Sequence, residues 1–530
     1  MTNRKLISSC IVCMTGLTIA GTADTNGLTA SQKPNIIFVL IDDMGWNHHS
    51  ARQPTTGHAR DFFKTPTIEH LANSGLSFTH CYSQPNCAPS RACLLTGQYP
   101  CRINNDIYTV GNLNRFIPSA KKKAPQFTGP EQSNDVAPTA ITVAEALQRN
   151  GYATAHIGKY HVGGSIKETM PENSGFDINI GGGAGGVGRT RWASQTGNKW
   201  GFKGGGHFDK YAEPYTEEYL TKYNFPLALN GKPKHVSDAM GDALENTIKT
   251  LADGKKPFYL QFHTYAVHKP ASARPDLKEA AAKRSRGHKE SVYEYAGFVS
   301  GVDVNLKRLF SAIRDPNGDG DTSDSIEDNT LLIFSSDNGG ISADNKPLKG
   351  VKGMFTEGGI RVPLIAYWKG RIPANTISNK MVHFVDFYPT FLELAGNSWR
   401  PDENEHPLDG ESFADLLFQP DVKAVRKPIF YLYPGYTRSV ATPCTVAIGD
   451  LEGKRYKLSY SYETDSWELY CLTDDIGERE NLVTERKDIA ADLASKLHHW
   501  LKQEHPTWNP KYPINKETGK PQPLPEFNAQ

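Results

Sequence analysis

The sequence predicts an α/β fold: a large, mostly parallel sheet sandwiched by helices, with a small C-terminal subdomain built on an antiparallel sheet. Continuous apolar runs typical of buried parallel strands occur at residues 33–46, 255–270 and 329–340. Amphipathic segments between these runs close with or near glycine, which favours helices on both faces of the sheet. After about residue 430 the pattern changes to short alternating strands, at residues 456–462 and 466–472.

Each predicted element follows from its own local pattern. The helices expected in the main domain are residues 65–75, 139–151, 235–254 and 384–396, and a last helix is expected near 486–503. Two strands end in polar pairs, and the third run ends in His268, which precedes Lys-Pro and should lie in a loop. We predict a main α/β domain at 34–430, an α+β subdomain at 431–505 and an irregular tail at 506–530.

The first 23 residues resemble an export signal. Arg4 and Lys5 precede the apolar run 6–20, and small residues follow it up to Ala23. The run is too short for a convincing membrane span; a buried first helix is the alternative, and a lipidation signal does not fit Cys10 or Cys13. We therefore expect residues 1–23 to be a cleaved signal peptide and the product to be periplasmic or secreted. No Asn-x-Ser/Thr sequon occurs, which favours a bacterial source.

Composition excludes a global electrostatic mode of binding. The chain has 530 residues, of which 38% are hydrophobic and 22% charged, as in soluble globular proteins. Lys and Arg number 59 against 58 Asp and Glu, so no overall field selects nucleic acid or an acidic membrane. Any anion recognition must come from local clusters.

Polar side chains follow two of the predicted strands. Asp42 and Asp43 come after the first, and Asp337 and Asn338 after the strand at 329–336. Ligands in open α/β sheets bind at the carboxyl ends of strands, where these groups could meet. Carboxylate and amide oxygens suit Ca²⁺ or Mg²⁺ better than Zn²⁺. One such pair alone would be explained by helix capping, but two pairs favour a metal site.

Cations and histidines accompany this predicted site. Lys159 and His161 are two residues apart and would share a face if the segment is extended. Lys352 lies in a glycine-rich stretch soon after Asn338, and Arg91 follows Cys87 by four residues. Arg91, Lys159, Lys352 and a metal ion would surround an anion, leaving His161 and His268 for proton transfer.

Eight cysteines are present, and two lie in the predicted signal peptide. If Cys87 serves chemistry, at most two disulfides can form among the other five, whose pairing cannot be deduced from sequence: Cys81, Cys93, Cys101, Cys444 and Cys471.

Two segments interrupt the alternation of strands and helices. Residues 179–206 are glycine-rich and predict a surface loop; a cofactor loop is the alternative, but no strand and helix flank it cleanly. Residues 315–326 begin like a calcium-binding loop but have Ile326 where glutamate is expected. A solvated acidic loop is favoured there over a second calcium site.

Together these motifs resemble the type I, formylglycine-dependent sulfatases of the alkaline phosphatase superfamily. The family signature Cys-x-Pro-x-Arg followed by Leu-Thr-Gly is matched at residues 87–97. The segment 158–164 resembles Gly-Lys-Trp-His-Leu-Gly with Tyr160 in place of Trp, and 352–363 resembles Lys-(x)4-Glu-Gly-Gly-x-Arg-x-Pro. Residues 384–396 and 467–482 match further landmarks, the latter with Cys471 where Asp is usual. The similarity extends from about residue 34 to 484.

The resemblance implies a mechanism. Cys87 would be oxidised to Cα-formylglycine (3-oxoalanine) by a formylglycine-generating or anaerobic sulfatase-maturing enzyme. Its hydrated aldehyde, bound to a cation held by Asp42, Asp43, Asp337 and Asn338, would attack sulfur. Arg91 would hold the formylglycine, and Lys159 would bridge it to the sulfate oxygens. His268 would protonate the leaving alcohol beside Lys352, and His161 would help to expel sulfate. Calcium is expected, with magnesium possible.

Exported sulfatases of this kind commonly act on sulfated carbohydrates, so we expect a sulfated polysaccharide or oligosaccharide, such as an algal galactan or fucan. Glycosaminoglycan fragments are the rival. The residues expected to contact substrate are His48, Arg189, Arg191 and Trp192, because arginine pairs with sulfate and tryptophan stacks on sugar rings. These segments could also be insertions that only cover the core. The lysine run 121–123 is expected to be a solvated loop, with contact to a polyanion as the alternative.

Two other functions are compatible with the sequence. A phosphonate or phosphodiester hydrolase of the same superfamily can share the signature, and activity ratios between sulfate and phosphate esters would separate the two. An inactive carbohydrate-binding protein is disfavoured, because every expected catalytic position is filled.

Overall fold

The computed structural model describes most of the chain after the predicted signal peptide. The described residues are 33–53, 55–57, 62–116, 124–185, 191–193, 200, 206–284, 287–341, 345–422, 426–438 and 441–528. The predicted signal peptide, Arg189 and the lysine run 121–123 lie outside them. None of the helices in the described part is long and apolar enough to cross a membrane.

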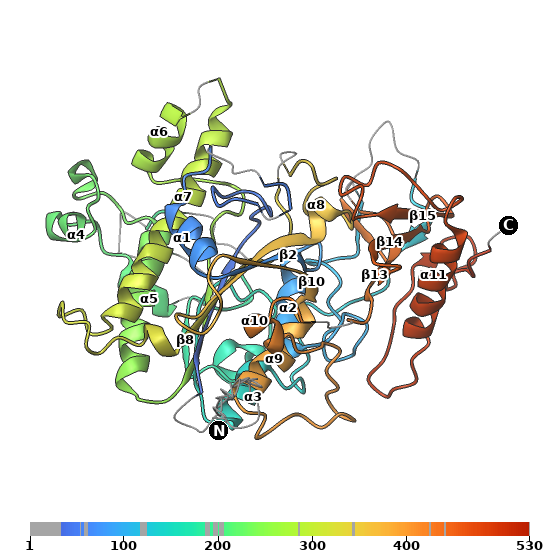
Figure 1. Ribbon diagram of the computed structural model, residues 1–530, viewed down its shortest axis with the longest axis horizontal. Coiled ribbons are helices and arrows are strands. Elements are labelled where there is room, and N and C mark those ends of the chain that lie inside the picture. The colour runs from blue at the N-terminus through green and yellow to red at the C-terminus, as the bar shows by residue number, and fades with distance from the viewer. Residues whose placement is uncertain are drawn as a thin grey trace, which may run out of the picture.

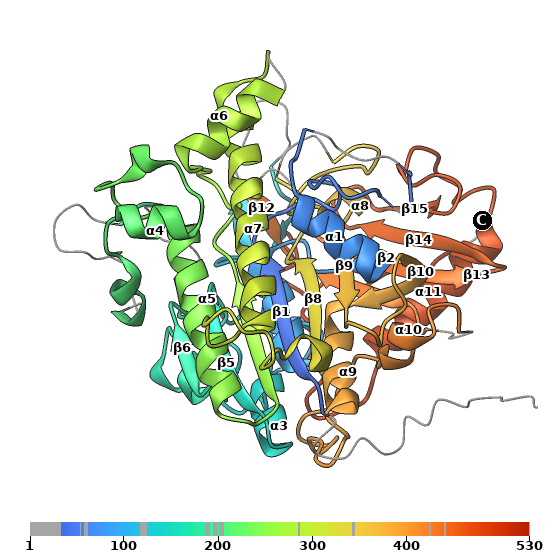
Figure 2. The same ribbon diagram turned by 60° about the vertical axis from the view of Figure 1, so that its left-hand side comes forward.

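An eight-stranded sheet forms the centre of the molecule (Figures 1 and 2). Its strand order is β10-β2-β9-β8-β1-β7-β5-β6. The strands are β1 (Asn35–Ile41), β2 (Leu76–Tyr82), β5 (Ala153–Gly158), β6 (Ile178–Ile180), β7 (Phe258–His263), β8 (Thr330–Ser336), β9 (Arg361–Tyr367) and β10 (Thr376–His383). Only β9 runs antiparallel to its neighbours in this sheet. The predicted mostly parallel sheet is confirmed.

Helices cover both faces of this sheet, as predicted. One face packs against α2 (Cys87–Thr96), α3 (Val143–Arg149) and α9 (Phe387–Leu394), and the other against α1 (Pro66–Ser74), α5 (Val236–Asp253) and α7 (Glu290–Arg314). The side chains of β1 alternate between the two cores: Phe38 faces the first and Val39 the second. The sheet is therefore buried on both sides, which explains its continuous apolar runs.

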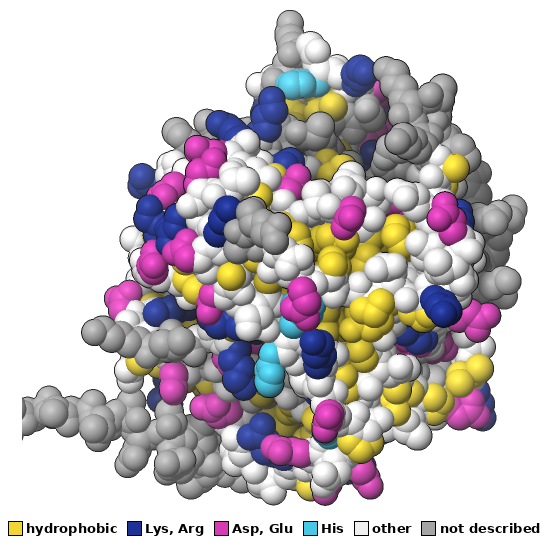
Figure 3. Space-filling view, turned by 90° about the vertical axis from the view of Figure 1, so that its right-hand side faces the viewer, with side chains coloured by type: hydrophobic (Ala, Val, Ile, Leu, Met, Phe, Trp, Pro, Cys, Tyr) yellow, Lys and Arg dark blue, Asp and Glu magenta, His cyan; other side chains and the backbone are white. Residues whose placement is uncertain are grey.

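The small antiparallel sheet is also confirmed. It has the order β11-β13-β14-β15, from β11 (Ile429–Tyr433), β13 (Cys444–Leu451), β14 (Lys454–Ser461) and β15 (Ser466–Cys471). Helix α11 (Lys487–Leu501) packs on β13 and β14 at the end of the molecule opposite α5 (Figure 1). Figure 3 shows this end, where apolar side chains gather near the centre and charged side chains of both signs surround them.

The C-terminal segment has little regular structure but packs firmly on the body. Strand β16 (Ile514–Asn515) pairs with β4 (Phe127–Thr128). Trp508 is 9% exposed, and its ring lies between Trp500, with centroids 5.2 Å apart, and the Arg102 guanidinium at 4.9 Å. This segment therefore covers part of the hydrophobic core and does not extend into solvent.

Several elements differ from expectation. Within the third apolar run, at 255–270, strand β7 extends only from Phe258 to His263, and His268 lies in the loop beyond it, as predicted. No helix was expected at α2, α4 (Glu217–Lys222), α6 (Pro275–Arg284) or α7. The predicted loop at 179–206 overlaps strand β6 at its start and the short helix Gly206–Tyr211 at its end, and it contains the buried Trp200. The six cysteines of the described chain are all free thiols.

Candidate active site

The site is built where β1 and β8 end side by side. These strands are parallel, with Ile41 opposite Ser336, so the residues that follow them meet at one edge of the sheet. The backbone N–H of Asp43 donates to Asp337 Oδ1 at 3.1 Å, and Asn338 Nδ2 donates to Asp43 Oδ1 at 3.0 Å. The four predicted ligands thus come together although nearly 300 residues separate the two pairs.

The residues present fit a divalent cation. Asp42 Oδ1 and Asn338 Oδ1 are buried and have no hydrogen-bond partner among the described residues. Ligand atoms of Asp42, Cys87 and Asp337 lie within 4.8 Å of one another. Unpartnered buried oxygens are costly, and a hard cation is the ligand that such an oxygen-rich set prefers.

The neighbouring carboxylates at the site repel one another. Burial raises the pKa of Asp42 to about 8; Lys159 counteracts this, but the neighbouring Asp337 and Asp43 reinforce it. Burial also opposes ionisation of Asp43, yet Lys352 and His268 hold its pKa well below its usual range. A divalent cation would relieve the repulsion at Asp42.

Three positively charged side chains surround the carboxylates. Lys159 Nζ lies 2.7 Å from Asp42 Oδ2, and neither side chain is exposed to solvent. Lys352 Nζ donates to Asp43 Oδ1 and lies 3.9 Å from Cys87 Sγ. Arg91 Nε and Nη2 both donate to Asp337 Oδ2, at 3.0 and 2.9 Å. With Cys87 unmodified, Arg91 is therefore paired with Asp337, one of the predicted metal ligands.

Cys87 begins helix α2, directly beside these charges. Asn86 precedes the helix in an extended conformation, and Gly97 ends it in the left-handed conformation that favours glycine (φ 67°). Cys87 is 2% exposed, and the positive end of the helix dipole is a favourable place for an anion. Burial raises the pKa of the Cys87 thiol despite Lys159 and Lys352, so the unmodified thiol is a poor source of thiolate.

Both predicted histidines lie at the site. His268 Nδ1 lies 2.6 Å from the Lys269 carbonyl, which leaves Nε2 facing Asp43 Oδ2 at 3.7 Å. Burial lowers the pKa of His268 to about 4, although Asp43 opposes the shift. Burial and the nearby Lys159 and Arg91 keep the pKa of His161 well below its usual value, and its Nδ1 has no partner in the described part of the chain. His161 is therefore a neutral group able to accept a proton.

Left-handed backbone marks two of these positions. Asp43 has φ 68° and His161 has φ 70°, a region that residues with a Cβ rarely adopt. Strain of this kind persists where the surroundings fix the conformation, as at active sites.

The loop that carries Lys352 is anchored to the strand end through glycines. The Lys352 N–H donates to the Gly340 carbonyl at 3.0 Å, and the Gly339 N–H to that of Gly359 at 2.9 Å. A Cβ on Gly339 would lie 2.0 Å from the Gly358 carbonyl oxygen. The stretch after Lys352 must therefore be glycine-rich, because two backbone segments touch.

A buried ion network connects this loop to the small sheet. Lys457 of β14 lies 3.3 Å from Glu357 and 2.9 Å from Glu478, and all three side chains are at most 2% exposed. Glu357 also accepts from Tyr82, and its own N–H donates to Glu478. Motif analysis detected the segment containing Glu357 but not its partner Lys457, whose pattern is that of an ordinary strand residue.

Two of the predicted substrate contacts are buried. His48 is fully buried and contacts the Tyr295 hydroxyl at 2.7 Å; this hydroxyl in turn donates to the Asp43 carbonyl. Arg191 is 3% exposed and donates from Nη2 to the His268 carbonyl at 2.9 Å. These contacts hold the backbone of Asp43 and of His268 in place. Contact with substrate stays a prediction for both His48 and Arg191.

Trp192 is half-buried and donates to Ser272 Oγ at 3.3 Å, in the loop that follows His268. His263, which sequence reasoning missed, lies 3.2 Å from Arg91 through its Nδ1. Its position at the end of β7, beside β1 and β5, was the available signal.

The acidic loop at 315–321 is ordered by its own backbone. Asp315 accepts from the N–H groups of Gly318 and Gly320, and Asp319 from that of Asp321. The described residues bring three potential metal-ligand atoms together only around Asp42. For 315–326 a solvated acidic loop stays the prediction, with a second calcium site as its alternative.

Comparison with known proteins agrees with this geometry. The model of the family described as Sulfatase matches residues 34–397. The chain belongs to the sulfatase family. It is therefore a sulfuric ester hydrolase. A second model, N-sulphoglucosamine sulphohydrolase, C-terminal, matches residues 351–505 of this sulfatase, which include the small sheet.

Similar proteins cover nearly the whole of this sulfatase. A protein named Sulfatase from Formosa agariphila is 36% identical over 90% of both chains. The N-acetylgalactosamine-6-sulfatase of Homo sapiens is 28% identical, over 83% of this chain and 74% of its own. Among solved structures, Ps i-CgsB in complex with k-i-k-neocarrahexaose superposes with a TM-score of 0.66, at 26% identity over 91% of this chain and 95% of its own.

A divalent cation should stabilise this sulfatase through the strand-end residues. We expect saturating Ca²⁺ to raise the free energy of unfolding, by about 2.7 kcal/mol at a hundredfold excess over Kd, because only the folded chain has the site. Asp42→Asn and Asn338→Ala should lose this stabilisation. Thermal unfolding with and without Ca²⁺ after chelator treatment measures it.

Asp315→Asn with Asp319→Asn is the matched control, since it removes two carboxylates from the other acidic loop. Loss of the calcium effect in this control, with retention in Asp42→Asn, would place the ion elsewhere.

Proposed function

We propose that this sulfatase hydrolyses sulfate esters on a sulfated carbohydrate and releases inorganic sulfate, using a formylglycine made from Cys87 and a bound Ca²⁺, with Mg²⁺ as the alternative ion. The observation that carries the proposal is the position of Cys87. Cys87 is the first residue of a helix. Its Sγ lies within 4.8 Å of ligand atoms of Asp42 and Asp337 and 3.9 Å from Lys352 Nζ.

Charge balance supports an anionic substrate. Asp42, Asp43 and Asp337 carry three negative charges when ionised, and Lys159, Lys352 and Arg91 carry three positive ones. A divalent cation therefore leaves the site with an excess of two positive charges. Because these groups are buried, little solvent screens that excess, which favours the sulfate group.

The formylglycine and the cation would supply a nucleophilic oxygen. The buried thiol of unmodified Cys87 would be a poor nucleophile instead, because its pKa is raised. The chain's own groups do the rest. Lys159 and Lys352 neutralise sulfate oxygens, and Arg91 fixes Asp337 and balances its charge. His268 acts as the general acid only when its Nε2, which faces the site, has taken up a proton; it then gives that proton to the leaving alcohol. Neutral His161 accepts the proton that must leave before sulfate is expelled.

The substrate class is proposed from the relatives. The structure of Ps i-CgsB holds a neocarrahexaose, which is a sulfated galactan fragment, and its chain is matched over 95% of its length. The human relative is named for N-acetylgalactosamine 6-sulfate, a glycosaminoglycan unit. We propose a sulfated galactan as the substrate, with fucans and glycosaminoglycan fragments as the competing sugars.

We also propose that residues 1–23 direct export to the periplasm or medium and that a maturation enzyme modifies Cys87 before folding. The second step is required because Cys87 is 2% exposed once folded, beyond the reach of another enzyme.

The function is tested by release of inorganic sulfate from defined sugars. We expect turnover of neocarrahexaose by the natively produced enzyme and none by Cys87→Ala. A panel of N-acetylgalactosamine 6-sulfate, a sulfated fucan oligosaccharide and a phosphate diester provides the comparison. Preference for the diester would contradict the sulfatase proposal, and preference for another sugar would correct the substrate.

Arg191 should act through His268. Its hydrogen bond to the His268 carbonyl fixes the loop that presents the general acid. We expect Arg191→Met to lower kcat about a hundredfold on a sugar sulfate, whose alcohol needs a proton, but less than about threefold on 4-nitrophenyl sulfate, whose leaving group does not.

Arg191→Lys should recover part of the loss, because it can still donate to the carbonyl. An increase in KM for the sugar at unchanged kcat would instead show that Arg191 binds substrate, as the sequence predicted. Equal losses on both substrates would contradict the positioning role.

A further inference from the structure

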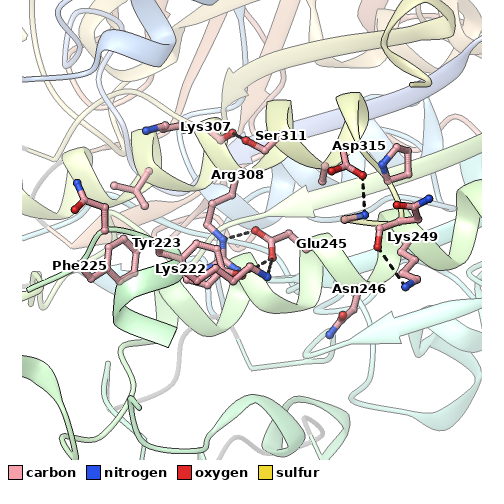
Figure 4. A pocket seen from close by; sticks show the side chains of 16 residues that line it. Lys222, Tyr223, Phe225, Glu245, Asn246, Lys249, Lys307, Arg308, Ser311 and Asp315 are labelled. Carbon is pink, nitrogen blue, oxygen red and sulfur yellow. Dashed lines mark hydrogen bonds and ion pairs between the residues drawn. The ribbon is translucent and has the colours of Figure 1, made fainter. Parts of the chain in front are cut away.

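A hollow of about 510 Å³ lies on the flank of the molecule, between the end of α4, helix α5 and helix α7. Figure 4 shows side chains from all three helices around it. Lys222 is the last residue of α4 and Tyr223 follows it, Glu245 and Lys249 come from α5, and Lys307 comes from α7. None of the proposed catalytic or metal residues lines this hollow.

A second hollow of about 590 Å³ adjoins the first. The two share Lys222, Tyr223, Glu245, Asn246 and Lys249, so they meet over one exposed stretch of α5. The pair therefore forms one elongated depression, in the size range of ligand-binding sites but too long for a single small anion.

Positive charge in the first hollow is left without free carboxylates. Glu245 is occupied by Arg308, at 2.7 Å, and by the Tyr223 hydroxyl, at 2.6 Å. The oxygens of Asp315 accept from two backbone N–H groups. The ammonium groups of Lys222, Lys249 and Lys307 lie on exposed residues of three different helices. Lys222 is 4.0 Å from the already occupied Glu245 and is 66% exposed.

The depression lies away from the active site. The α5 and α7 residues of the first hollow are in the C-terminal halves of these helices, which lead into β7 and β8 at the N-terminal edge of the sheet. The second hollow also reaches Asp242 in the N-terminal half of α5, but none of the proposed catalytic or metal residues lines it. The catalytic residues follow the C-terminal ends of the strands. A ligand in the depression therefore leaves the nucleophile accessible, and only a long molecule can reach both.

We propose that this depression is a non-catalytic binding site for a sulfated polysaccharide, which tethers the polymer while another part of it is desulfated. Ammonium groups on three helices suit the repeated sulfates of a polymer, and the Asn246 amide, which also lines both hollows, suits sugar hydroxyls. Because the net charge of the whole chain is near zero, it does not attract a polyanion in general. A local cluster of positive charges must therefore bind it. The ligand class rests on the proposed function.

The test uses the full chain carrying Cys87→Ala, so that no hydrolysis occurs. Dextran sulfate is the probe, plain dextran its uncharged comparison, and binding is followed by affinity electrophoresis. We expect Lys222→Ala/Lys249→Ala/Lys307→Ala to weaken binding of dextran sulfate about tenfold or more. The control, Lys427→Ala/Lys502→Ala/Lys516→Ala, removes the same charge from exposed lysines next to β11, α11 and β16 and should bind like the parent.

Equal weakening in both triple variants, or none in the first, would overturn the proposal. So would equally tight, lysine-dependent binding of double-stranded DNA, which would indicate general polyanion attraction. In the enzyme with native Cys87, the first variant should raise KM for polymeric iota-carrageenan and leave kcat and KM for neocarrahexaose unchanged. If the native enzyme hydrolyses neither, the proposed substrate fails while the binding result still decides the tethering site.

Discussion

The parallel pairing of β1 with β8 is the constraint on which the active site depends. It sets Ile41 beside Ser336 and therefore brings Asp42, Asp43, Asp337 and Asn338 to one place. Three buried carboxylates could not remain together without compensation, and Lys159, Lys352 and Arg91 supply it. The rest of the site is arranged around these charges. Helix α2 begins at Cys87 beside them, and a glycine-rich loop places Lys352 next to Asp43.

The small C-terminal sheet contributes to the same arrangement. Lys457 pairs with Glu357 and Glu478 in a buried network, and Glu357 ends the loop that carries Lys352. Removing one member of such a network leaves an uncompensated buried charge, so the sheet and the loop are held together strongly. The large sheet thus fixes the proposed metal ligands and Cys87, the proposed nucleophile precursor, whereas the small sheet fixes Lys352 opposite them.

Sequence predicted those parts of the molecule that depend on local pattern. The buried runs ending in aspartate, the Cys87–Gly97 signature and the antiparallel strands after residue 430 were all detectable without a structure. Contacts made by residues without a distinctive pattern were not. Lys457 is an ordinary strand residue by sequence, and the roles of Arg191 and His48 depend on loops that fold back behind His268 and Asp43. The apolar run at 255–270 continues beyond the last ladder pair of β7 at His263, so the run alone does not show where this strand ends.

The central claim is that Cys87 becomes the aldehyde on which this arrangement of charges converges. The most direct measurement is a peptide mass spectrum across residues 81–102 of natively produced protein. The account predicts that Cys87 has lost its sulfur and gained an aldehyde oxygen, while Cys81, Cys93 and Cys101 in the same peptide remain thiols, as in the structure. An unmodified thiol at Cys87 in fully active, exported enzyme would contradict it, because the buried thiol would then have to be the nucleophile.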